Sequence, residues 1–177
     1  MSFDKLERNL IDIIKEEQAK LGFFEEDIRL YYPLSSLNHF FDSTDNAGEM
    51  QERLEHFPEG STDRLGDIRV THKGDRFCFH IPPKGTVFVH ENTAPNEFIC
   101  QLVELVGRHG CTMNEIKNLF HTYSENIFCE DMNNGEFDCL IRFLDKPEDP
   151  YYYCFKDEGC HIIYHRFLPA DYADFDF

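Results

Sequence analysis

Two patterns of apolar and polar residues alternate along this chain of 177 residues. In the first, apolar residues recur every three or four positions, which predicts amphipathic helices. In the second, apolar and polar residues alternate, which predicts strands with one buried face. The helical pattern covers residues 4–21, 35–41, 49–57, 94–109 and 112–124. The strand pattern covers residues 27–32, 66–81, 86–90, 127–144 and 151–167.

Runs of strands separated by runs of helices are typical of an α+β fold with antiparallel pairing. The order predicts an N-terminal helical segment, a three-strand meander, a central helix pair and a four-strand meander. The first meander turns at Lys73-Gly74, and Asn134-Gly135 predicts a type I′ turn in the second. A chain of this length is most simply one domain. Its parts are a helical segment to about residue 60, a mixed part over 66–168 and an acidic aromatic tail over 169–177.

The hairpin over residues 151–167 has the clearest alternation in the chain. A turn centred on Glu158-Gly159 uses the freedom of glycine to adopt positive φ. This register pairs Phe155 with Ile162 and collects aromatic and branched side chains on one face, which we expect to be buried. The buried face is predicted to hold Tyr151, Tyr153, Phe155, Cys160, Ile162 and Tyr164. The wetter face is predicted to hold Tyr152, Cys154, Lys156, His161, Ile163 and His165.

The hairpin over residues 66–81 gathers basic side chains on its polar face. With Val70 opposite Phe77, Arg69 and Arg76 lie on a diagonal, close enough to reach one anion. Guanidinium groups bind carboxylate or phosphate in a bidentate manner. We therefore expect a ligand-binding spot for an anion, made by Arg69, Arg76, His80 and Lys73. The alternative is that these arginines form ion pairs with carboxylates of the protein itself.

The net charge of −17, from 17 basic and 34 acidic residues, bears on the choice of partner. Phosphate contacts need Lys or Arg, so this charge opposes binding to nucleic acid. The helices over 94–124 and the following hairpin have the order of a winged helix, but acidic residues occupy the tip of its wing. An acidic surface favours a partner protein with a basic surface. The alternative is an acidic surface that only contacts solvent.

The C-terminal tail alternates acidic with aromatic residues. Such a segment could dock on a partner, with acids guiding the encounter and rings as anchors. The docking residues would then be Tyr172, Phe175 and Phe177. Alternatively, the rings pack back on the protein itself.

Seven cysteines are present, with no Cys-x-x-Cys pair and no secretory signal at the start of the sequence. They predict reduced thiols and a cytoplasmic location. No run of about 18 apolar residues indicates a membrane helix. Cys154, Cys160, His161 and His165 resemble a zinc set by type, but the predicted register points Cys160 away from the others. We expect no metal and no cofactor.

The phrases over residues 30–37 (LYYPLSSL) and 151–161 (YYYCFKDEGCH) resemble an uncharacterised bacterial family of unknown function, over nearly the whole chain. The resemblance implies a bacterial protein and supplies no catalytic residues. Nucleophile elbows and phosphate-binding glycine loops are absent from the sequence, so enzyme activity has no location in it. The charge favours an acidic protein-interaction or regulatory module. The alternative is a binder of a small anion, or an enzyme, that uses the Arg69/Arg76/His80 face. A concave pocket at this face would favour the small-molecule binder or enzyme, whereas a flat surface would favour the interaction module.

Overall fold

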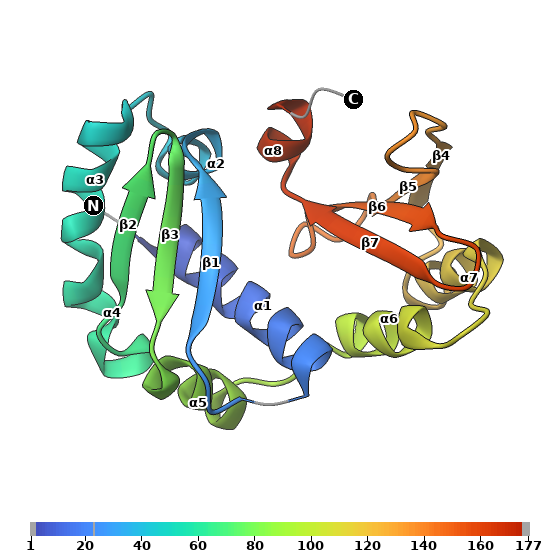
Figure 1. Ribbon diagram of the computed structural model, residues 1–177, viewed down its shortest axis with the longest axis horizontal. Coiled ribbons are helices and arrows are strands. Elements are labelled where there is room, and N and C mark those ends of the chain that lie inside the picture. Colours follow the sequence, from blue (N-terminus) through green and yellow to red (C-terminus); the bar gives the residue numbers. More distant parts are fainter. Residues whose placement is uncertain (1–2, 23, 175–177) are drawn as a thin grey trace. The chain divides into compact units, whose positions relative to one another are not determined.

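A computed structural model describes residues 3–22 and 24–174 (Figure 1). The chain divides into two compact units, Met1–Glu97 and Phe98–Phe177. The single domain expected from the sequence stays a prediction. Unit 1 contains α1 (Asp4–Leu21), β1 (Ile28–Pro33), α2 (Leu34–Phe41), α3 (Ala47–Glu55), α4 (Phe57–Leu65), β2 (Arg69–Lys73), β3 (Arg76–Ile81) and α5 (Pro83–Asn92). Unit 2 contains α6 (Glu97–Gly107, whose first residue closes unit 1), α7 (Met113–Tyr123), β4 (Ile127–Asp131), β5 (Cys139–Phe143), β6 (Tyr152–Asp157), β7 (Ile162–Phe167) and α8 (Pro169–Asp174).

The predicted α+β class is confirmed, with one antiparallel sheet of three strands and one of four. The sheet of unit 1 has the order β1-β3-β2. Its core face carries Leu30, Tyr32, Phe77, Phe79 and Ile81, which are all buried. Helix α1 supplies Leu6, Leu10 and Ile14 to the same core, and the hydroxyl of Tyr32 donates a buried hydrogen bond of 2.7 Å to Asn9 on this helix.

The strand predicted over residues 86–90 is wrong, because these residues lie in helix α5. Proline in the first turn starts the helix, where its missing N–H is tolerated. Thr86 and Val89, three residues apart, are both buried, and Gly85 lies against the carbonyl oxygen of Leu65 in α4. Packing between the two helices therefore overrides the β propensity of this segment. The third strand of the sheet is β1.

The four-strand meander of unit 2 is confirmed, in the order β4-β5-β6-β7. Helices α6 and α7 cover one face through contacts between aromatic rings, with Phe98 and Phe120 packing against Phe143 and Tyr153. Helix α7 begins at Thr112 with a capping box in which Thr112 and Glu115 bond each other's backbone N–H groups. In the two described parts of the chain, no helix is long and apolar enough to cross a membrane.

The register predicted for the last hairpin is wrong by two residues, but the side chains keep their predicted faces, and only two of them differ clearly from the burial expected there. Phe155 pairs with Tyr164 instead of Ile162, and the turn is centred on Gly159-Cys160. Because side chains alternate, a shift by two residues leaves each on its predicted face. Tyr153, Phe155 and Ile162 are buried, as expected.

The two exceptions are cysteines. Cys160 lies exposed in the turn, and Cys154 is fully buried on the face expected to be wetter. That face carries a second, small core of Phe137, Leu140 and Cys154, against which Met132, Tyr152, Phe167 and Tyr172 pack. The small core therefore covers part of the second face of this sheet, on which Ile163 and His165 stay exposed.

The type I′ turn predicted at Asn134-Gly135 is also wrong. Glycine has the positive φ of 88° that such a turn needs, but the second positive φ belongs to Asn133. The ladder already ends at the hydrogen bond from Met132 N–H to the Asp138 carbonyl. The side chain of Asn134 accepts hydrogen bonds from the N–H groups of residues 136 and 137, which stabilises a wider loop.

Candidate binding surface

The three-stranded sheet of unit 1 has one face that contacts the core and one that is largely exposed. We call the second the open sheet face. Its side chains are Arg29, Tyr31 and Pro33 on β1, Arg76, Cys78 and His80 on β3, and Arg69, Thr71 and Lys73 on β2. Cys78 and His80 are half-buried and the other seven are exposed. None of the nine is a carboxylate, in a chain with twice as many acidic as basic residues.

The cations of the open sheet face lie in two rows across the strands. In the first row, Arg29 and Arg69 both pair with His80 of the central strand, from opposite sides. In the second row, Arg76 pairs with Lys73. The rows are four residues apart, or about 13 Å along the strands. Their arrangement is fixed by the backbone ladder, so the positions of these charges do not depend on loops.

The diagonal contact predicted between Arg69 and Arg76 is wrong. The turn is centred on Gly74-Asp75, one residue later than expected, so Val70 pairs with Phe79 and the two arginines fall in different rows. Alternation still places both on the predicted face. Arg29 was not among the residues predicted for this site. The signal was present in the alternation of 27–32, but the pairing of β1 with β3 bridges about fifty residues, and no local pattern shows it.

Within the described residues, none of the four cations Arg29, Arg69, Lys73 and Arg76 forms an ion pair. Four other cations of unit 1, Lys5, Lys20, Arg53 and Arg64, do pair with acidic residues of the protein. Distances from nitrogen to oxygen are 2.6 Å for Arg53–Asp45, 2.8 Å for Arg64–Glu7 and 3.1 Å for Lys5–Asp42. Among the residues that the structure describes, Arg69 and Arg76 therefore have no carboxylate of the protein itself as an ion-pair partner.

Two contacts orient side chains within the open sheet face. The guanidinium carbon of Arg76 lies 5.2 Å from the ring centre of Tyr31, in a cation–π contact on a ring that is 54% exposed. Nε2 of His80 lies 3.5 Å from the sulfur of Cys78. Each contact leaves donor groups of the arginine and the histidine available to a ligand. The face therefore offers planar cationic donors with an aromatic ring between the rows.

A family profile described as "Domain of unknown function, E. rectale Gene description (DUF3877)" matches residues 3–175. The chain belongs to this family. The match covers both units, which confirms the resemblance to an uncharacterised bacterial family. No curated protein and no solved structure matches this DUF3877 chain.

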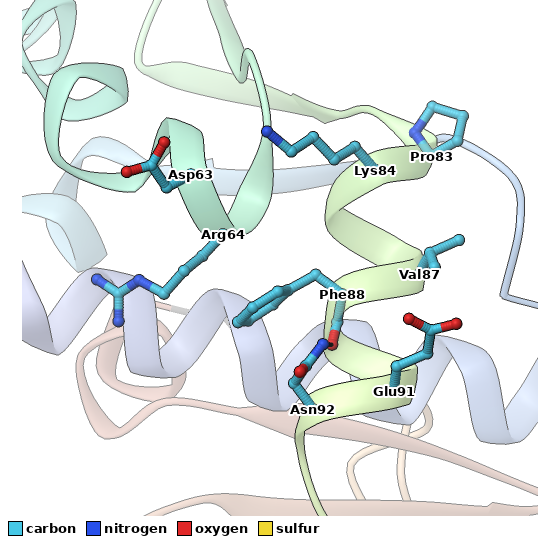
Figure 2. A pocket seen from close by; sticks show the side chains of 8 residues that line it. All are labelled: Asp63, Arg64, Pro83, Lys84, Val87, Phe88, Glu91 and Asn92. Carbon is cyan, nitrogen blue, oxygen red and sulfur yellow. Dashed lines mark hydrogen bonds between the residues drawn. The ribbon is translucent and has the colours of Figure 1, made fainter.

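A second candidate site in the DUF3877 chain is a hollow of about 370 Å³ between α4 and α5 (Figure 2). It is lined by Asp63, Arg64, Pro83, Lys84, Val87, Phe88, Glu91 and Asn92. Its cations already have partners, since Arg64 donates to Glu7 and Lys84 donates to the carbonyl of Thr62 at 3.1 Å. Burial raises the pKa of Glu7, although the neighbouring Arg64 acts to lower it. The hollow therefore differs from the open sheet face, because its lining mixes carboxylates (Asp63 and Glu91) with cations.

The four residues of unit 2 that resemble zinc ligands do not come together. Cys160 and His161 are exposed in the turn, with the sulfur 3.1 Å from Nδ1. Cys154 is fully buried in the small core, where desolvation raises the pKa of its thiol to about 12. Over residues 3–22 and 24–174, no group of three or more His, Cys, Asp or Glu side chains could hold a metal ion.

The residues predicted to dock on a partner fall at the end of the chain. Tyr172 lies in α8 and packs against Tyr152 and Phe167, with ring centres 4.7 and 6.3 Å apart. This placement follows the alternative in which the tail packs back on the protein. Phe175 and Phe177 lie outside the described residues, so their docking role stays a prediction.

Proposed function

We propose that this DUF3877 chain is a protein-interaction module whose open sheet face binds an acidic segment of a partner protein. The observation that carries the proposal is the set of four cations on one exposed face without a carboxylate partner among the described residues. Opposed like charges destabilise a sheet. An anionic ligand would neutralise them, and the planar guanidinium group of arginine can bind a carboxylate in a bidentate manner.

The shape of the face favours a macromolecular ligand over a small one. Its donors are spread over three strands of a sheet, in rows about 13 Å apart, which one small anion cannot span. An extended peptide places alternate side chains on one side, so acidic residues four positions apart would match the two rows. The hollow between α4 and α5 includes none of the nine side chains of the open sheet face. The small-molecule alternative thus has less support.

Two other partners fit less well. Nucleic acid would also bind to cations, but a net charge of −17 repels a polyanion over the rest of the molecule. A basic partner, favoured by net charge alone, would have to bind elsewhere on the acidic surface. We place the module in the cytoplasm, in agreement with seven free thiols.

The test is binding of a fluorescent peptide that alternates Glu and Thr, measured by anisotropy on the full chain at low salt. A peptide that alternates Gln and Thr is the control ligand. We expect only the Glu peptide to bind, with affinity lost at high salt. Arg29→Gln and Arg69→Gln should each weaken binding severalfold, whereas Lys5→Gln, which removes an equal charge from α1, should not. No binding, or tighter binding of a labelled single-stranded RNA than of the Glu peptide, would overturn the proposal.

A further inference from the structure

Two cysteines of unit 2 lie close together on neighbouring strands. Cys129 is on β4 and Cys139 on β5, and their sulfur atoms are 3.6 Å apart. The register pairs Cys129 with Ile141 and Asp131 with Cys139, so the two cysteines are diagonal neighbours on the face that α7 covers. Within the described residues, which include all seven cysteines, no other pair of sulfurs is in contact.

The two thiols have different environments. Cys129 is exposed, whereas Cys139 is only 3% exposed. Desolvation, with a hydrogen bond to Cys129, raises the pKa of Cys139 to about 12, which keeps this thiol protonated. A thiol in such a state is a poor nucleophile toward an oxidant. The exposed Cys129 is therefore the one that meets solutes first.

Lys117 on α7 gives Cys129 a cationic neighbour. Burial acts to lower the pKa of Lys117, but the nearby Cys129, Cys139 and Asp131 outweigh it and raise this pKa, so the ammonium group persists. The ammonium group lies 3.8 Å from Asp131, close enough to both cysteines for their charges to affect its pKa. A cation at this position stabilises negative charge on the Cys129 sulfur as it reacts.

We propose that Cys129 and Cys139 form a reversible oxidation site, at which Cys129 reacts with a hydroperoxide and Cys139 completes a disulfide. In the first step, the Cys129 thiolate attacks one oxygen of hydrogen peroxide and the O–O bond breaks. Cys129 becomes a sulfenic acid, and the leaving hydroxide takes a proton to become water. In the second step, the Cys139 sulfur displaces the sulfenic oxygen, which leaves as a second water. Two thiols lose two electrons and the peroxide gains them.

The fold can accommodate the disulfide. Bonded sulfurs lie about 2.05 Å apart, so the atoms must approach by about 1.5 Å. In the described part of the chain, strand β4 is the edge of its sheet and pairs only with β5, so a small shift of β4 breaks no second ladder there. The exposed Cys100 and Cys160 have no sulfur neighbour among the described residues and serve as internal controls.

The experiment exposes the reduced full chain to limited hydrogen peroxide, blocks the remaining thiols with an alkylating reagent and maps the peptides by mass spectrometry. We expect a Cys129–Cys139 disulfide to form before Cys100 or Cys160 is oxidised, and dithiothreitol to reverse it. In Cys139→Ser, dimedone should trap a sulfenic acid at Cys129. Lys117→Met should slow oxidation of Cys129 severalfold and leave the rate at Cys100 unchanged.

Oxidation of Cys100 or Cys160 ahead of Cys129 in the wild-type chain would overturn the proposal. So would a dimedone adduct at Cys129 that persists in the wild type without a disulfide to Cys139. Both outcomes are read on the unmodified sequence, so they do not depend on how the variants fold. The result is independent of peptide binding by unit 1.

Discussion

Arg29 and Arg69 lie on the two outer strands of unit 1 and both pair with His80 of the strand between them. Adjacent strands are about 4.8 Å apart, so the two arginines start about 10 Å from each other with no carboxylate in the row. Their repulsion destabilises the free protein. An acidic ligand would neutralise the two charges and remove this repulsion.

Replacing Arg29 or Arg69 with threonine should therefore stabilise the free protein. Threonine fits a strand, and the loss of a like-charged neighbour should raise the free energy of unfolding by about 0.2–1 kcal/mol at low salt. Urea titrations measure it. Repeating them at high salt is the control, because screening should abolish the gain. A fall in stability at low salt would mean that these charges are already neutralised in the free protein.

Adjacent isoleucines on β7 test the faces of the last hairpin. Ile162 is 2% exposed and Ile163 is 40% exposed. Ile162→Ala removes buried methyl groups and leaves a cavity, so it should cost about 2–5 kcal/mol of unfolding free energy. Ile163→Ala makes the same chemical change on the other face and should cost less than about 1 kcal/mol. Equal losses in urea unfolding would contradict the face assignment.

Gly85 tests the helix that replaced a predicted strand. A Cβ atom at this position would overlap the carbonyl oxygen of Leu65, a backbone atom that cannot rotate away. Gly85→Ala should therefore lower the free energy of unfolding by about 1–3 kcal/mol. Gly107→Ala, at the end of α6, meets nothing within 4 Å and should be neutral or stabilising by up to about 1 kcal/mol. Tolerance of alanine at both sites in thermal unfolding would refute the close contact between α4 and α5.

Asp171 in α8 should make the stability of unit 2 depend on pH. Burial raises the pKa of Asp171 to about 6 from an ordinary value of 3.8, with a smaller contribution from Asp174, and one of its buried oxygens lacks a hydrogen bond. A raised carboxyl pKa means that the protonated form is favoured in the folded state. The protonated Asp171 therefore contributes fully to the free energy of unfolding below about pH 3.8, and this contribution is lost as the pH rises through about 6.

Asp171→Asn should remove this loss of stability at neutral pH, because asparagine does not ionise. We expect the variant to be more stable than the wild type near pH 7 and closer to it near pH 4, in urea titrations at both values. Hydrogen exchange in α8 should show the same trend, because the helix contains the group that titrates. A difference that does not change with pH would argue that Asp171 is already solvated in the folded protein.

Alternation in the sequence was enough to place side chains on faces but not to pair them. Arg69 and Arg76 were assigned to the correct face with the wrong neighbours, and so were Phe155 and Ile162. The two errors have one origin. A two-residue turn accepts glycine at its first or its second central position. Gly74 and Gly159 were predicted at the second position and occupy the first.

Contacts between distant segments could not be predicted at all. Helix α5 forms because Gly85 fits against α4, which is a tertiary contact that outweighs the branched residues around it. Cys154 is buried because Phe137 and Tyr172 reach it from outside the hairpin. For the same reason the predicted site lacked Arg29, since Arg29 lies beside His80 only through the pairing of β1 with β3.

The division of the chain between Glu97 and Phe98 also separates its chromophores. The protein has no tryptophan, so its intrinsic fluorescence comes from eight tyrosines. Tyr31 and Tyr32 belong to unit 1 and the remaining six to unit 2. Tyrosine emission therefore follows mainly the melting of unit 2, while far-ultraviolet circular dichroism follows the helices and strands of both. Superimposable denaturation curves from the two signals would mean that the units unfold as one cooperative system, and separated curves would give each unit its own free energy.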